Sequence, residues 1–169
     1  DFLYREEPFS LPALGEGELL IQSMAFLCAP TIRNWMDEAS GNFMPTIKLG
    51  EPVRGPCAAR VIASANPDFP VGSRVCTIGN WQDYDIVSEA RALIRRIPDG
   101  FSFIEALGPV GMNALTAYFG VLEIGKPKAG ETVLVSGAAG SVGTVATQIA
   151  KILGCRVIGI AGGRAKCAW

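Results

Sequence analysis

A glycine-rich turn over residues 137–143 has the residue types and spacing that a phosphate-binding loop requires. It reads Gly-Ala-Ala-Gly-Ser-Val-Gly, and Ala138, Gly140 and Gly143 take the three glycine positions of the dinucleotide fingerprint. Gly140 would let the backbone approach a pyrophosphate with no Cβ in the way, and Gly143 would let the following helix pack closely on the preceding strand. The helix N-terminus would offer unpaired N–H groups and its positive dipole end to the phosphates.

The sequence on either side of this turn predicts a strand–helix–strand unit. Residues 132–136 are apolar enough for a buried strand, a helix is expected over residues 141–153, and Gly154 stands where a helix-ending glycine belongs. A second buried strand is expected over residues 155–161. Such a unit implies parallel strands joined by a right-handed crossover. A glycine pattern alone also fits a tight turn that binds nothing, but this context favours a dinucleotide site.

The residues after the second strand indicate which dinucleotide would bind. Sites that prefer NAD usually place an acidic residue there to hold the ribose 2′-hydroxyl. This chain has Ala161-Gly162-Gly163 with no acid, followed by Arg164 and Lys166. Basic side chains suit a 2′-phosphate, although both could equally be solvated charges at the start of a helix. We therefore expect NADP(H), with Gly162 and Lys166 among its contacts.

Histidine is absent from the chain, and the cysteines have no metal-site spacing. A Ser-His-Asp triad, a histidine base and a histidine-ligated metal are therefore excluded within these residues. The five cysteines are odd in number and form no CxxC pair, so we expect free thiols in a reducing cytoplasm, with neither disulfides nor bound metal. They are Cys28, Cys57, Cys76, Cys155 and Cys167.

Composition places the chain among soluble globular proteins. Of its 169 residues 49% are hydrophobic and 18% charged, and the net charge is −1. No basic stripe suggests nucleic-acid binding, no apolar run is long enough to span a bilayer, and residues 1–5 do not resemble a signal peptide. Neither a nucleic acid nor a membrane is therefore expected as a partner.

The first half predicts a compact β structure that precedes the strand–helix–strand unit. Short apolar segments are separated by glycine and proline, which is typical of a barrel or sandwich. The expected strands cover residues 18–27, 53–65, 74–78 and 81–87. Ser102 and Glu105 form a capping-box pattern for a short helix, and residues 112–122 predict another. We place the domain boundary between residues 108 and 109, with a catalytic domain over 1–108 and the first part of a nucleotide-binding domain over 109–169.

Several stretches of the chain match a known family pattern. They are residues 49–55, 66–69, 81–84, 115–120, 130–133, 138–143, 148–151 and 166–169. Together they resemble zinc-independent medium-chain dehydrogenases, in particular the prostaglandin reductase, leukotriene hydroxydehydrogenase and alkenal double-bond reductase group. The resemblance covers nearly the whole chain.

This resemblance implies an α/β fold in which a barrel-like, GroES-like β domain is followed by the start of a Rossmann doubly wound parallel sheet. It also implies hydride transfer from NADPH to the β-carbon of an α,β-unsaturated ketone or aldehyde, the expected small-molecule partner, and it allows a homodimer of the full-length protein. The turn residues that match the family's pyrophosphate contacts are Gly140, Ser141, Val142 and Gly143. Lys166 matches the lysine near the 2′-phosphate.

Two further positions, Met112 and Thr116, match residues near the nicotinamide. Met112 and Tyr118 could instead be core residues of an apolar helix, and for Tyr118 we adopt that interpretation. No side chain matches a proton donor, so no catalytic residue is assigned. That donor could be a backbone N–H, the cofactor ribose or water.

The chain departs from the family pattern in three places. Ala29-Pro30-Thr31 replaces Asp-Pro-Tyr, Pro56-Cys57-Ala58-Ala59 replaces a glycine run or an aromatic residue, and Asn113-Ala114 replaces Pro-Gly after Met112. The first two changes fall on the expected substrate wall. A quinone reductase of the same superfamily, and a non-catalytic NADP-binding or sensing protein, therefore stay open as alternatives.

One completed strand–helix–strand unit is less than a doubly wound sheet needs. We therefore expect the chain to be a fragment, or the ordered part of a longer polypeptide, and to be inactive by itself. As a fragment it should expose apolar surface from Val133, Val135, Ile158 and Ile160.

Overall fold

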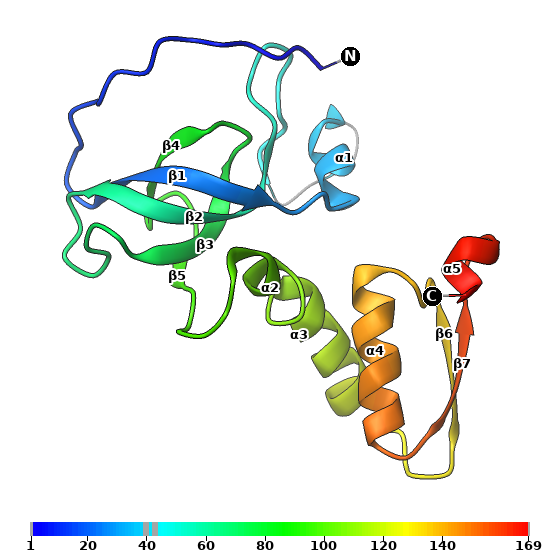
Figure 1. Cartoon of the computed structure of the whole chain (residues 1–169). Coiled ribbons are helices and arrows are strands. Elements are labelled where there is room, and N and C mark those ends of the chain that lie inside the picture. Colours follow the sequence, from blue (N-terminus) through cyan, green and yellow to red (C-terminus); the bar gives the residue numbers. More distant parts are fainter. Residues whose placement is uncertain (1, 39–40, 42–43, 169) are drawn as a thin grey trace.

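The computed structural model describes residues 2–38, 41 and 44–168 and places them in two β structures joined by helices (Figure 1). The first is a five-stranded antiparallel sheet with the order β4-β1-β2-β3-β5. The second is a parallel pair, β6 and β7. The first sheet contains β1 (Glu18–Phe26), β2 (Arg54–Ser64), β3 (Arg74–Asn80), β4 (Tyr84–Ser88) and β5 (Arg95–Arg96).

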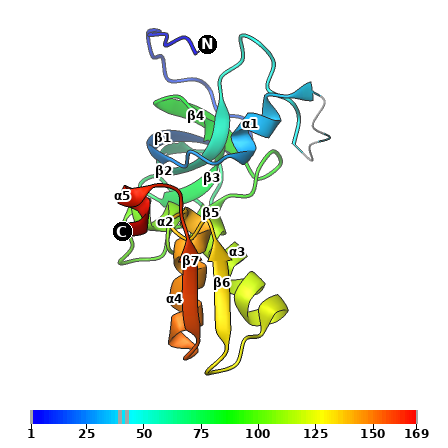
Figure 2. The same ribbon diagram turned by 90° about the vertical axis from the view of Figure 1, so that its right-hand side faces the viewer.

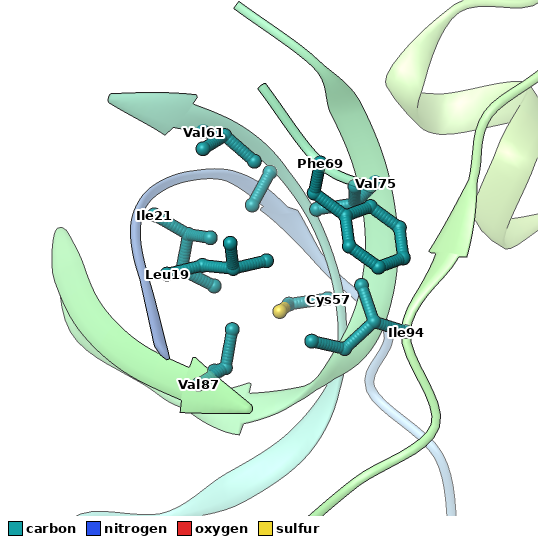
Figure 3. Close-up of a cluster of buried hydrophobic side chains, with 9 residues drawn as sticks. Leu19, Ile21, Cys57, Val61, Phe69, Val75, Val87 and Ile94 are labelled. Atoms are coloured by element: carbon teal, nitrogen blue, oxygen red, sulfur yellow. The ribbon is translucent and has the colours of Figure 1, made fainter. Parts of the chain in front are cut away.

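The five strands curve around a hydrophobic core (Figure 3). Leu19, Ile21, Cys57 and Val61 point into the enclosed space from β1 and β2, as the alternation of side chains along a strand requires. The same core contains Ala59, Phe69, Val75, Val87 and Ile94. Burial raises the pKa of the Cys57 thiol to about 12, and the nearby Asp85 carboxylate adds to the shift. At neutral pH Cys57 is therefore an unreactive thiol that packs as a small apolar side chain.

A helix covers the other face of this sheet and leads the chain into the second half. It is α2 (Phe103–Leu107), whose Ala106 and Leu107 pack on Ala58 of β2. The predicted capping box is present. The Ser102 hydroxyl accepts from the Glu105 N–H at 3.2 Å, and the Glu105 carboxylate accepts from the Ser102 N–H at 2.8 Å.

Three features of the first half differ from the sequence-based expectation. A short helix, α1 (Thr31–Trp35), and the two-residue strand β5 were not predicted. The last predicted strand begins at Tyr84 instead of residue 81, because residues 81–83 form the turn after β3. Asp85 holds this turn, since its carboxylate accepts from the Asn80 N–H at 2.7 Å and the Asn80 side-chain amide at 3.1 Å.

The second half contains the predicted strand–helix–strand unit. The strands β6 (Thr132–Ser136) and β7 (Arg156–Ile160) run parallel, with α4 (Ser141–Ile152) between them in sequence. Gly154 adopts a φ of +80° just after the helix, as predicted for a C′ glycine. Before this unit stand α3 (Met112–Tyr118) and the π-helix η2 (Phe119–Gly125), and after it α5 (Arg164–Ala168). The helix predicted over 112–122 thus continues to Gly125 with a change of winding, and Trp169 lies outside the described residues.

Within the residues that the structure describes, only one face of the parallel pair is covered, by α4 (Figures 1 and 2). Leu134, Ile158 and Ile160 are 63%, 41% and 52% exposed. The expectation that Val133 and Val135 are exposed is wrong, because strand alternation turns these two residues towards α4, where they are partly buried. The sheet therefore presents Leu134 with its register partner Ile158, and Ile160, as an open apolar face.

All five cysteines are free thiols. Cys57 and Cys155 are buried, Cys76 is partly buried, and Cys28 and Cys167 are exposed. The domain boundary between residues 108 and 109 stays a prediction. Residues 108–111 form a tight turn that leads from α2 into α3. A Cβ on Gly111 would lie 2.5 Å from the carbonyl oxygen of Leu107.

Candidate cofactor-binding site

The glycine-rich turn lies at the carboxyl ends of β6 and β7, where parallel sheets bind ligands (Figure 2). Gly137 takes a φ of +60°, which favours glycine, and reverses the chain directly after β6. The Gly140 N–H donates to the Gly137 carbonyl at 2.8 Å, and the Ala138 N–H donates to the Ile160 carbonyl at 3.0 Å. The turn is therefore fixed internally and also anchored to the end of β7.

Gly143 and Gly159 make this close packing possible. A Cβ on Gly143 would lie 2.3 Å from the Gly137 oxygen and 2.8 Å from the Ala138 Cα, so no side chain fits there. A Cβ on Gly159 of β7 would lie 2.8 Å from the Ala138 Cβ. The structure thus places Gly143 in the helix–strand packing position that the fingerprint assigns to its third glycine.

The N-terminal end of α4 has the features of an anion site. Gly140 is its N-cap residue, with an extended backbone (φ −86°, ψ 169°), and no side chain caps the helix there. The Gly140 carbonyl accepts the first helical hydrogen bond, from the Thr144 N–H at 2.8 Å. The N–H groups of Ser141, Val142 and Gly143 therefore begin the helix without intrahelical partners and can receive a phosphate. These three N–H groups with Gly140, which we call the cradle, are backbone groups without a side-chain cap, and such a donor set suits a phosphate.

Helix α3 lies alongside α4 and brings further candidate residues to this end of the molecule (Figure 1). Met112, its first residue, has a 55% exposed side chain. The Thr116 hydroxyl donates to the Met112 carbonyl at 2.9 Å, so that hydroxyl is directed into its own helix. The Asn113 side-chain amide donates to the Ser141 hydroxyl at 2.9 Å. Sequence reasoning missed this contact between helices, since its two residues are 28 positions apart.

The interpretation of Tyr118 as a core residue is wrong. Its side chain is 47% exposed, and it lines a hollow between α3 and α4 together with Leu115, Val145 and Ile149. The buried residues of α3 are small ones, Ala114 and Ala117. Large apolar residues on this helix are therefore left at its surface.

The residues expected to bind the 2′-phosphate follow β7 at the same end. No heavy atom of the described residues lies within 4 Å of a Cβ built on Gly162, and Gly163 turns the chain into α5 with a φ of +80°. Figure 2 shows α5 beyond the carboxyl ends of both strands. Lys166 is exposed on this helix, and its side chain makes no ion pair within the described part of the chain. The ammonium group is therefore free to meet an anion.

Over the same described residues, no three His, Cys, Asp or Glu side chains come together in a way that could hold a metal ion. The absence of a metal from the working protein stays a prediction. No described helix is long and apolar enough to cross a membrane.

The family described as "N-terminal domain of oxidoreductase" matches residues 1–95. The NADPH-dependent curcumin reductase of Escherichia coli (strain K12) is 39% identical over 169 residues, which are 99% of this chain and 47% of that protein. Prostaglandin reductase 1 of Bos taurus is 40% identical over 161 residues, 94% of this chain and 46% of that protein. The chain belongs to the prostaglandin, curcumin and alkenal reductase group of medium-chain oxidoreductases.

The solved structures agree with this membership in the reductase group. CurA from Vibrio vulnificus, solved in complex with NADPH, superposes with a TM-score of 0.83 at 38% identity. The superposition covers 96% of this chain and 48% of the CurA chain. The predicted fold class is thereby confirmed: an antiparallel β domain followed by the start of a parallel sheet with helices. The chain spans about half the length of the curated relatives it matches, 47% and 46% for the two named above.

Proposed function

We propose that the protein reduces the carbon–carbon double bond of α,β-unsaturated ketones or aldehydes with NADPH. The observation that carries this proposal is the cradle at the start of α4, where no side chain caps the helix and the turn packs so closely on the helix that a Cβ on Gly143 would lie 2.3 Å from the Gly137 oxygen. Such a cradle suits the pyrophosphate of a dinucleotide. The curcumin reductase, which is described as NADPH-dependent, and the CurA structure with NADPH support the same cofactor.

Each candidate residue has a specific part in this proposal. The N–H groups of Ser141, Val142 and Gly143 bind the pyrophosphate, and Gly140 lets it approach. Lys166 binds the 2′-phosphate, and Gly162 leaves space beside it.

The nicotinamide end would lie near α3, along Met112 and Thr116. Bound NADPH supplies the hydride. The exposed thioether of Met112 offers an apolar contact for the ring, while the Thr116 hydroxyl is already satisfied by its own helix. These residues position the cofactor and exclude water, and none of them transfers a proton.

The proposed substrate class is supported by what the residues of this chain can and cannot stabilise. Oxidation of an alcohol in zinc-dependent relatives requires a metal that lowers the alcohol pKa, and the chain has no histidine among its residues to bind one. Reduction of an enone requires only a hydride aimed at the β-carbon and a hydrogen-bond donor for the enolate oxygen. The names of the curcumin, prostaglandin and alkenal reductases point the same way.

A substrate panel tests the proposal. The protein at its natural length is mixed with NADPH and with enones, alkenals, quinones and simple alcohols (the last with NADP), and the absorbance of NADPH is followed. We expect turnover with enones or alkenals, none with simple alcohols, and no loss of activity on dialysis against a chelator. Preference for quinones would indicate a quinone reductase instead. Tight NADPH binding without any turnover would indicate a binding or sensing protein.

A further inference from the structure

Asn113 and Ser141 join α3 to α4 at the end where the glycine-rich turn lies. The Asn113 Nδ2 atom donates a hydrogen bond of 2.9 Å to the Ser141 Oγ atom. Asn113 is the second residue of α3, directly after Met112, and Ser141 is the first residue of α4, directly after Gly140. Asn113 is partly buried and Ser141 is exposed, so the amide approaches from the protein side and leaves the hydroxyl open to solvent.

This contact determines what the Ser141 hydroxyl can do. A serine hydroxyl has one proton to donate and lone pairs that accept. Because the amide N–H of Asn113 occupies a lone pair, the hydroxyl proton cannot point at Asn113 and is left for a partner on the open side. An acceptor with negative charge there would receive a charge-assisted hydrogen bond, the stronger kind.

We propose that Asn113 is a positioning residue that orients the Ser141 hydroxyl as a donor to a phosphate oxygen of the dinucleotide. This inference rests on the proposed function, since it requires a pyrophosphate at the start of α4. It also gives a reason for the departure at residue 113, where the family pattern has Pro after Met. A proline has no side-chain donor, so the hydrogen bond belongs to this chain and not to that pattern.

The same contact would link the two ends of the cofactor. Met112, proposed to lie near the nicotinamide, is the neighbour of Asn113, and Ser141 is proposed to bind the pyrophosphate. Fixing Asn113 to Ser141 fixes the start of α3 relative to the phosphate cradle. Loss of the contact should therefore weaken dinucleotide binding and leave the melting temperature nearly unchanged.

The test is a double-mutant cycle on the protein at its natural length, with the dissociation constant of NADPH measured by fluorescence titration. Asn113→Ala and Ser141→Ala should each weaken NADPH about three- to tenfold, and the double variant should be no weaker than Ser141→Ala. Asn113→Asp has the same shape but accepts the hydroxyl proton and adds negative charge, so it should lose about tenfold. Asn113→Gln, which keeps an amide donor, should retain part of the affinity.

A matched control removes a side-chain amide of α4 that does not contact Ser141. The Gln148 side chain donates to the Thr144 carbonyl at 3.1 Å on the exposed side of that helix, so Gln148→Ala should leave NADPH affinity unchanged. Adenosine 2′-monophosphate, which has the 2′-phosphate but no pyrophosphate, serves as the second ligand. Its affinity should be the same for all Asn113 variants, and so should the melting temperature to within a few degrees.

The outcomes separate this inference from the proposed function. If the wild-type protein binds neither NADPH nor adenosine 2′-monophosphate, the cofactor site itself is wrong and the inference falls with it. If the wild type binds both, but Asn113→Asp binds NADPH as tightly as wild type or the two alanine effects add fully, Asn113 does not act through Ser141. Equal losses for both ligands would show a general loosening of the fold, and would also overturn the inference.

Discussion

Replacing Gly143 by alanine is expected to weaken NADPH binding by about a hundredfold and to destabilise the protein by about 1–3 kcal/mol. The added Cβ would lie 2.3 Å from the Gly137 oxygen and 2.8 Å from the Ala138 Cα, and both of these are backbone atoms that cannot rotate away. The start of α4 must then move off the turn, and the N–H groups that face the phosphates move with it. A charge-assisted hydrogen bond contributes about 1.5–3 kcal/mol, so losing one or two of them accounts for the expected loss.

The variant Gly120→Ala is the matched control for this prediction. Gly120 lies in η2, has no heavy atom within 4 Å of an added Cβ and has no positive φ, so alanine should fit there without cost. Thermal melts and NADPH titrations of both variants give the comparison. Wild-type stability and affinity for Gly143→Ala would show that the turn does not bind the cofactor as we propose.

Replacing Lys166 by alanine is expected to weaken NADPH ten- to a hundredfold while leaving NADH affinity nearly unchanged. The Lys166 ammonium is exposed and without an ion pair in the described chain, and no acidic residue follows β7 between Ala161 and Lys166. Its proposed partner, the 2′-phosphate, is the only group by which NADPH differs from NADH. A loss confined to NADPH therefore reports directly on that contact.

Lys151→Ala provides the control for charge alone. Lys151 is an exposed lysine in the last turn of α4, away from the helix end that holds the turn. Its removal lowers the net charge by the same amount but should change neither affinity. Equal losses of NADPH and NADH on removing Lys166 would contradict its assignment to the 2′-phosphate.

The strand–helix–strand unit could be predicted because its signals are local. The apolar strand before the turn, the glycines at Gly140 and Gly143, and the helix-ending Gly154 each act on residues close in sequence, and the structure has all three where expected. The capping box of α2 is local in the same way. Periodicity and turn chemistry are sufficient for such elements.

Elements that depend on distant contacts could not be predicted. The helix α1 has only five residues and is held by burial of Ile32 and Trp35, and β5 has two residues that pair with β3. The start of β4 is moved to Tyr84 by hydrogen bonds that Asp85 makes back to Asn80. None of these leaves a periodic pattern in a short window of sequence.

The candidate site also has one part that the sequence predicts and another part that it does not. The glycines of the turn could be found from their spacing, but the contact between Asn113 and Ser141 arises only when α3 packs on α4. The exposure of Tyr118 could not be predicted either, because the sequence of an apolar helix does not indicate which of its faces the fold will cover. Site residues that act through packing between elements therefore require the structure.

Deuterium transfer tests the proposed double-bond reduction most directly. The protein at its natural length is given NADPH with deuterium at both C4 positions of the nicotinamide, together with an α,β-unsaturated ketone, and the product is examined by NMR. We expect a saturated ketone with one deuterium on the β-carbon and a solvent-derived hydrogen on the α-carbon. Deuterium on the carbonyl carbon, or a product without deuterium, would contradict the proposed reaction.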